Sequence, residues 1–184
     1  MSFILMGVIL ILCCFYGYIK YTDKKAEKLY FKALERFEED KLDEALKIFE
    51  EIRKRYPISR YSKLSFPFLG YIYFSKGDYN KAILAYENFK KTMQSDIYTF
   101  LSVLSISCCY EEEKKTDEAI KILEDLIKRY PDNPLEEFAL LKLEMLYRKK
   151  DKKRAKQILE RFIRKYPESP FFYIAKARLL SYNK

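Results

Sequence analysis

The sequence FLGYIYFSKGDYNKA, at residues 68 to 82, decides the fold because its last residue belongs to a regular column of alanines. These alanines recur at intervals of 37, 37 and 36 residues. Two further columns keep the same phase, since a large side chain follows each alanine by four residues and a mostly small residue precedes it by twelve. Columns in phase over four copies indicate an internal repeat. The columns hold Ala45, Ala82, Ala119 and Ala155; Phe49, Tyr86, Leu123 and Leu159; and Ala33, Gly70, Ser107 and Leu143.

The spacing inside each copy predicts two helices joined by a turn. Between Leu42 and Ile52 the apolar residues recur every three or four positions, as on one face of a helix, and Pro57 ends that helix. A small residue on the first helix, opposite the alanine of the second, allows the two helices to approach closely. Because one such pair cannot bury its apolar face alone, the copies are expected to stack on one another.

This pattern resembles the tetratricopeptide repeat family. Residues 68 to 82 match that family's Leu-Gly, Tyr and Gly-Asp-Tyr-x-x-Ala positions nearly throughout, and the resemblance covers about residues 26 to 168. The sequence departs from the family in its longer period, in Gln94 where the other copies end in proline, and in Leu143 at a small position. Endings such as Tyr130-Pro131 resemble the bacterial envelope branch of the family, which includes the membrane-anchored ancillary subunit of the Sec translocon.

The repeat and the resemblance together predict an all-α fold, a right-handed helical solenoid of four helix-turn-helix units with a capping helix. This solenoid is expected to follow an N-terminal transmembrane helix. The expected domains are an anchor at residues 1–22 and a solenoid at residues 23–184. Pro67 lies inside the first helix of the second unit, so that helix either begins near Ser65 or kinks. The units are expected at residues 26–58, 63–96, 100–132 and 136–168, and the capping helix at 170–182.

Residues 3 to 19 form an uncharged run that is just long enough to cross a bilayer core. Tyrosines and Lys20 follow it, as expected at a membrane interface. A cleavable signal peptide fits less well because the run lacks a basic start and small residues at its end. The prediction is therefore an uncleaved anchor, with a cleaved signal and a buried or acylated helix as alternatives. No Gly or Pro lies between Gly17 and Pro57, so the anchor helix is expected to run directly into the first repeat.

The predicted localisation is the cytoplasmic (inner) membrane, which the chain is expected to cross once. The charges beside the apolar run indicate on which side the C-terminal domain lies. Lysines follow the run whereas only the terminal amine precedes it, and this bias places the C-terminal domain in the cytoplasm. The Sec-associated resemblance implies the opposite, extracytoplasmic (periplasmic) side, so both remain open. The lysines are Lys20, Lys24, Lys25 and Lys28.

The resemblance also implies that the first helices of the units line a groove for a protein or peptide partner. Aromatic rings with a few fixed charges suit such a groove, because rings supply contact area at low entropic cost. The alternative is that Tyr30 and Tyr71 are partly buried packing residues. Neither Asn nor Lys or Arg recurs at the groove positions in the way that a carboxylate clamp requires, so binding of a chaperone's C-terminus is not expected. The groove candidates are Tyr30, Leu34, Tyr71, Ser75, Cys108, Glu112, Leu140, Glu144 and Arg148.

Positive charge concentrates near the C-terminus, and much of it lies in one turn. Residues 135 to 184 hold 14 Lys plus Arg against 6 Asp plus Glu, which is +8 of the chain's net +9. This turn is either simply solvated or binds anionic lipid, nucleic acid or an acidic partner. Nucleic acid is disfavoured because no recognised motif accompanies the cluster. The basic patch comprises Arg148, Lys149, Lys150, Lys152, Lys153 and Arg154.

The composition argues against catalysis. With no His, the chain lacks an imidazole base and any Ser-His or Cys-His pair, and its four Gly provide no phosphate-binding loop. The cysteines form two adjacent pairs, Cys13-Cys14 and Cys108-Cys109, which is neither a zinc nor a redox spacing. We therefore expect a scaffold without catalytic residues, cofactor or metal.

Overall fold

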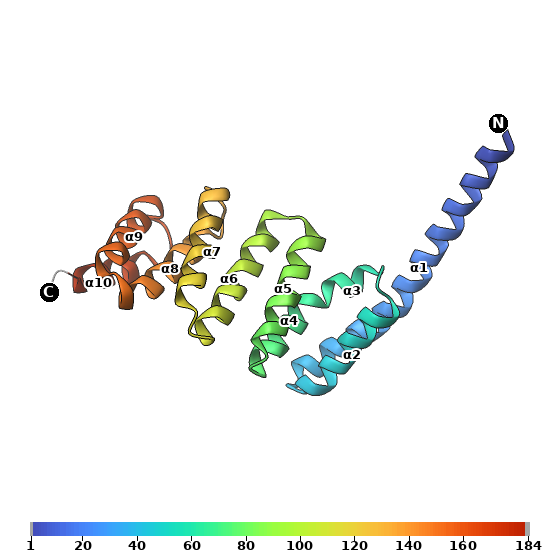
Figure 1. Ribbon diagram of the computed structural model, residues 1–184, viewed down its shortest axis with the longest axis horizontal. Coiled ribbons are helices and arrows are strands. Elements are labelled where there is room, and N and C mark those ends of the chain that lie inside the picture. The colour runs from blue at the N-terminus through green and yellow to red at the C-terminus, as the bar shows by residue number, and fades with distance from the viewer. Residues whose placement is uncertain (1, 183–184) are drawn as a thin grey trace. The chain divides into compact units, whose positions relative to one another are not determined.

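The computed structural model describes residues 2–182, and in that range the regular structure is entirely α-helical (Figure 1). The predicted fold class is thus confirmed. The chain forms two compact units, Met1–Thr92 and Met93–Lys184. The helices of the first unit are α1 (Ser2–Glu38), α2 (Leu42–Arg55), α3 (Arg60–Leu64), α4 (Phe66–Ser75) and α5 (Tyr79–Met93); those of the second are α6 (Asp96–Glu112), α7 (Thr116–Arg129), α8 (Glu136–Lys150), α9 (Lys152–Lys165) and α10 (Phe172–Ser181).

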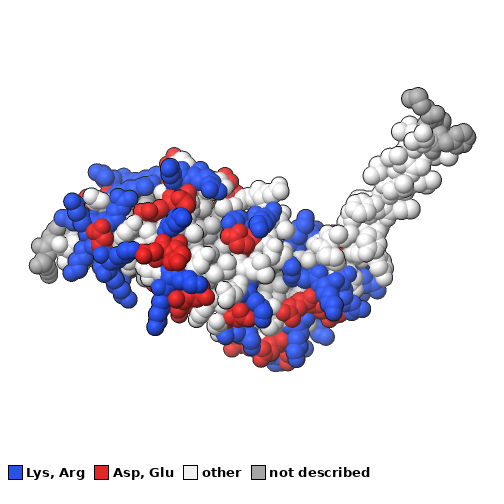
Figure 2. Space-filling model, in the orientation of Figure 1, with Lys and Arg blue, Asp and Glu red and all other residues white. Residues whose placement is uncertain are grey.

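Helix α1 is one unbroken helix of 37 residues, as the absence of Gly and Pro after Gly17 predicted. Its first half is exposed, and Ile4 and Ile11 are 75% and 70% accessible to solvent. Figure 2 shows this half without a charged residue. Its most apolar window has a mean hydropathy of 1.9 and is entirely unburied, so α1 is long and apolar enough to cross a membrane.

The second half of α1 belongs to the first unit. Ala26 and Ala33 are fully buried, α1 packs against α2, and the Asp23 carboxylate accepts hydrogen bonds from Ser59 Oγ (2.6 Å) and from the Arg60 backbone N–H (2.9 Å). The Tyr61 hydroxyl donates to Glu27 Oε1 at 2.6 Å. The expected domain boundary at residue 22 therefore lies inside one continuous helix. The side chain of the next residue, Asp23, already contacts the first repeat unit.

The first unit also contains a short helix that the repeat pattern did not predict. Ser59 caps α3 by accepting a hydrogen bond from the Tyr61 backbone N–H at 3.2 Å. Helix α4 then begins at Phe66, with Pro67 in its first turn, where the missing N–H of proline costs nothing. Of the two possibilities for Pro67, the helix start near Ser65 is thus correct.

All four alanines of the repeated column are fully buried. A close contact between helices lies between α4 and α5. A Cβ atom added at Gly70 would stand 2.6 Å from the Tyr86 ring, which is only 9% exposed. Only glycine fits at this position without displacing the ring.

Replacing Gly70 with alanine is therefore expected to destabilise the first unit by about 1 kcal/mol, because an overpacking cost of about 1–3 kcal/mol is partly offset by the better helix propensity of alanine. Urea unfolding followed by circular dichroism measures this. In a Tyr86→Leu background, which removes the ring, the same substitution is expected to cost nothing or to stabilise. An equal loss in both backgrounds would contradict the proposed contact.

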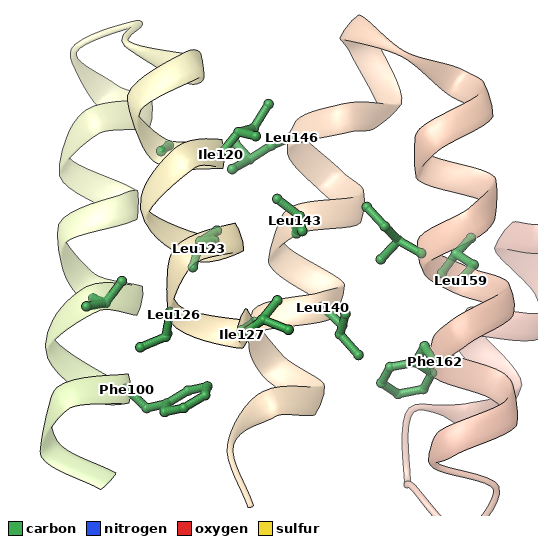
Figure 3. Close-up of a cluster of buried hydrophobic side chains, with 14 of the residues drawn as sticks. Phe100, Ile120, Leu123, Leu126, Ile127, Leu140, Leu143, Leu146, Leu159 and Phe162 are labelled. Carbon is green, nitrogen blue, oxygen red and sulfur yellow. The ribbon is translucent and has the colours of Figure 1, made fainter. Parts of the chain in front are cut away.

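The core of the second unit combines side chains from its successive helices, and Ala175 of α10 joins those of α6 to α9. Phe100 of α6, Leu123 of α7, Leu143 of α8 and Phe162 of α9 are each at most 4% exposed (Figure 3). The pairs α6–α7 and α8–α9 repeat the arrangement of α1–α2 and α4–α5, so the described residues contain the four helix-turn-helix pairs that the columns predicted.

Helix α10 packs on α9 where a capping helix was expected. It is held by a buried carboxylate, because Glu144 of α8 accepts hydrogen bonds from Arg178 (3.0 Å) and from the Tyr182 hydroxyl (2.8 Å). The outer side of α10 is not polar throughout, since Tyr173 is 80% exposed.

Candidate functional site

The nine groove candidates divide by burial. Tyr71, Ser75, Glu112 and Arg148 are exposed, and Leu34 and Cys108 are half-buried. The structure buries the remaining three, so they are corrected from ligand contacts to packing residues. Each has a local cause: the Tyr30 ring lies among other aromatic rings, Leu140 lies in the core between α7 and α9, and Glu144 is covered by α10. These three are Tyr30, Leu140 and Glu144.

In the first unit the candidate surface centres on Tyr71. Its ring is 49% exposed and packs edge-on against Phe37 of α1, with the ring centroids 5.4 Å apart. One turn further along α4, Ser75 Oγ donates to the Tyr71 carbonyl at 3.0 Å. The ring is thus fixed on one side and open on the other, which suits an anchor for a partner.

In the second unit the candidate surface contains an ion pair that sequence reasoning missed. Lys142 of α8 pairs with Glu111 of α6 next to Cys108. Burial disfavours the charge of Lys142, but the hydrogen bonds and charges of Glu111 and Cys108 outweigh it and raise the lysine pKa. No sequence signal identifies this pair, because its members lie on separate helices, 31 residues apart.

The basic patch forms the end of α8 and the first turn of α9. Asp151 caps α9 by accepting a hydrogen bond from the Arg154 backbone N–H at 3.0 Å. Lys150 pairs with Asp117 and Arg154 with Glu124, whereas the other four cations have no acidic partner within ion-pair distance among residues 4–182. Two of these, Lys152 and Lys153, lie at a helix N-terminus, where the helix dipole disfavours positive charge. The patch is thus exposed and largely uncompensated.

The structure also reveals two hollows between second helices, which no sequence pattern indicated. The first, of about 480 Å³, lies between α2 and α5 over α4. The second, of about 820 Å³, lies between α7 and α9 over α8, and we call it the outer groove. Both have volumes in the range of ligand pockets. The outer groove is lined by Glu124, Asp125, Ile127, Lys128, Pro131, Leu140, Leu143, Arg154, Gln157, Ile158, Arg161 and Arg164.

The cysteines are all free thiols. Cys109 is fully buried, and burial raises its pKa to about 12, which disfavours the reactive thiolate. In the part of the chain that the structure describes, no three metal-ligating side chains come together.

Comparison with known proteins supports the repeat assignment. A family model described as a tetratricopeptide repeat-like domain matches residues 1–128, and a tetratricopeptide repeat model matches residues 138–169. The outer membrane protein assembly factor BamD of Caulobacter vibrioides is 25% identical over an alignment of 134 residues, and the match covers 68% of this chain and 44% of that protein. The chain thus spans less than half the length of this relative.

Solved structures agree on the fold. A tetratricopeptide repeat protein from Parabacteroides merdae superposes with a TM-score of 0.70 at 18% identity, over 87% of this chain and 60% of that one. MamA from Desulfovibrio magneticus RS-1 superposes with a TM-score of 0.64 at 15% identity, over 79% and 77% of the two chains. Proteins with this fold are generally non-catalytic scaffolds for protein interaction. With more than half of its length matched by the family model, this chain belongs to the tetratricopeptide repeat-like domain family.

Proposed function

We propose that the protein is a membrane-anchored scaffold that holds a protein partner next to the bilayer. The observation that carries this proposal is the continuity of α1, whose exposed apolar half and repeat-forming half are one helix. The second half of α1 is fixed to the first unit through Asp23. A helix that spans the bilayer would therefore hold the first unit close to the membrane surface without a flexible linker.

The partner is proposed to contact the first helices, with Tyr71 as an aromatic anchor in the first unit and Arg148 as a fixed charge in the second. Both side chains are exposed, and Arg148 has no acidic partner among the described residues. Similarity to an outer membrane protein assembly factor favours a role in envelope assembly. Resemblance to the membrane-anchored ancillary Sec subunit favours assistance to protein translocation as the alternative.

Replacing Tyr71 and Arg148 together with alanine is expected to reduce recovery of the partner about tenfold or more, because exposed aromatic and arginine anchors dominate binding energy. Quantitative mass spectrometry of proteins co-purified with the full chain measures this. Tyr173→Ala with Lys149→Ala is the matched control, since it removes an exposed tyrosine and an exposed cation elsewhere. Equal recovery with both double variants would reject the first-helix surface.

The side of the membrane is tested with a single cysteine at Glu168, an exposed position in the loop before α10, after replacing the four native cysteines with alanine. The lysines after the apolar run lead us to propose a cytoplasmic location. The Glu168→Cys thiol is then expected to resist an impermeant maleimide in intact spheroplasts and to react after lysis. Labelling before lysis would instead place the repeats on the periplasmic side.

A second candidate function is binding of anionic lipid by the basic patch, favoured by its four uncompensated cations. Each basic residue near an anionic surface contributes about 1 kcal/mol. A fragment for this test must keep Thr22, which is buried, and Asp23, so it begins at residue 21. Sedimentation of this fragment with phosphatidylglycerol but not phosphatidylcholine vesicles is expected; equal sedimentation with both would exclude the function.

A further inference from the structure

The two hollows between second helices occupy the same positions of the repeat. Glu50 and Lys54 line the first hollow, and the residues 74 positions later, Glu124 and Lys128, line the outer groove. The same hydrogen bond, from a tyrosine hydroxyl to a glutamate, lies at the edge of each hollow. The Tyr73 hydroxyl donates to Glu50, and the Tyr147 hydroxyl donates to Glu124 at 2.9 Å. The hollow is therefore a regular feature of the fold and not an irregularity of one loop.

The outer groove differs from the first hollow in its rim. Arg161 and Arg164 line it, whereas Asn88 and Lys91 stand at the equivalent positions of α5. Arg161 is bound to buried Glu136, but Arg164 and Lys128 have no acidic partner within ion-pair distance among residues 4–182. Two uncompensated cations thus face a cavity that is larger than its counterpart.

The floor of the outer groove is apolar and includes Leu143 and Ile158. We propose that the outer groove binds an acidic segment of a partner protein that also carries a large apolar side chain. The apolar side chain covers the floor, and carboxylates of the segment pair with Lys128 and Arg164. This site lies on second helices and does not depend on the first-helix surface proposed above.

The lining residues favour a protein segment over other anions. None of them is aromatic, so the groove lacks the stacking surfaces that single-stranded nucleic acids use. Glu124 and Asp125 lie on the same rim and would repel a run of phosphates. In contrast, a peptide offers backbone N–H groups that can donate to these two carboxylates while its own carboxylates pair with the cations.

The test is selection of a random peptide library, displayed on phage, against the full chain in phosphatidylcholine nanodiscs. Peptides that combine Asp or Glu with Leu, Ile or Phe are expected to be enriched. Replacing Lys128 and Arg164 together with Glu is expected to weaken binding of an enriched peptide about tenfold or more in fluorescence anisotropy, because the two charges that would pair with the peptide carboxylates are reversed.

Lys149→Glu with Lys152→Glu is the control, since it makes the same charge change at exposed positions of the basic patch. It is expected to change affinity less than about twofold, and Tyr71→Ala is expected to have no effect. Enrichment of non-acidic peptides, or equal loss with both charge-reversal variants, would overturn the proposal. Two other results, obtained without enrichment of acidic peptides, would also overturn the proposal. Self-association that only K128E/R164E abolishes would assign the groove to a second copy of the chain. Phosphatidylglycerol binding that only K128E/R164E abolishes would assign it to lipid.

Discussion

Replacing Ile9 and Leu12 together with arginine is expected to move the full-length chain from the membrane fraction to the soluble fraction. Both side chains are exposed on the first half of α1. Each arginine in the centre of a spanning helix costs about 2.5–3.5 kcal/mol, so the pair removes about 5–7 kcal/mol of insertion free energy. Immunoblotting of carbonate-extracted membranes measures the distribution.

Phe31→Arg is the control for this experiment. Phe31 lies on the same helix and is 57% exposed, but it follows Lys20 and belongs to the repeat-forming half. A chain anchored only by residues 3 to 19 is expected to stay in the membrane when this position is charged. Release by Phe31→Arg, or retention of the double variant, would contradict the proposed limits of the anchor.

The repeat was predictable because its columns report a steric requirement. Where two helices approach closely only small side chains fit, and this condition recurs through the repeat except at Leu143 in the last helix pair. The four buried alanines and the contact of Gly70 with the Tyr86 ring are what the columns encode. The unbroken α1 was predictable for a similar reason, since neither Gly nor Pro interrupts it after Gly17.

The polar contacts between helices were not predictable. A repeat pattern treats glutamates as surface residues, yet Glu136 and Glu144 are fully buried. Their side-chain partners lie 25 to 38 residues later in the chain, and no spacing rule connects residues so far apart. The family resemblance placed Glu144 and Leu140 in a ligand groove, although α10 covers Glu144 and Leu140 lies in the core.

Replacing Glu136 with alanine is expected to destabilise the second unit by about 3 kcal/mol, the largest effect of a single substitution that we predict. The carboxylate is fully buried and accepts hydrogen bonds from Arg161, from Lys165 (2.6 Å), from the Tyr166 hydroxyl (3.0 Å) and from the Asp132 backbone N–H (3.1 Å). Removing one member of such a buried group costs about 3–5 kcal/mol. The lower end applies here because Arg161 and Lys165 remain partly exposed and regain water.

The same carboxylate predicts how stability depends on pH. Burial opposes ionisation of Glu136, but the hydrogen bonds from Lys165, Tyr166 and the Asp132 backbone outweigh it and lower the pKa. A lowered pKa stabilises the folded state above the unfolded-state value of about 4.3, and this contribution is lost as the pH falls through the folded-state pKa. Urea unfolding of the full chain in detergent is therefore expected to show a midpoint that decreases below about pH 5.

In Glu136→Gln this acid-induced decrease is expected to be smaller, because the amide does not titrate, while part of the stability at neutral pH is lost. Glu137→Gln is the matched control, since Glu137 is the next residue in the first turn of α8 and is only half-buried. It is expected to change stability by less than about 0.5 kcal/mol and to keep the acid-induced decrease. Equal effects of the two glutamines would mean that the charge at the start of α8, and not the buried network around Glu136, stabilises the second unit.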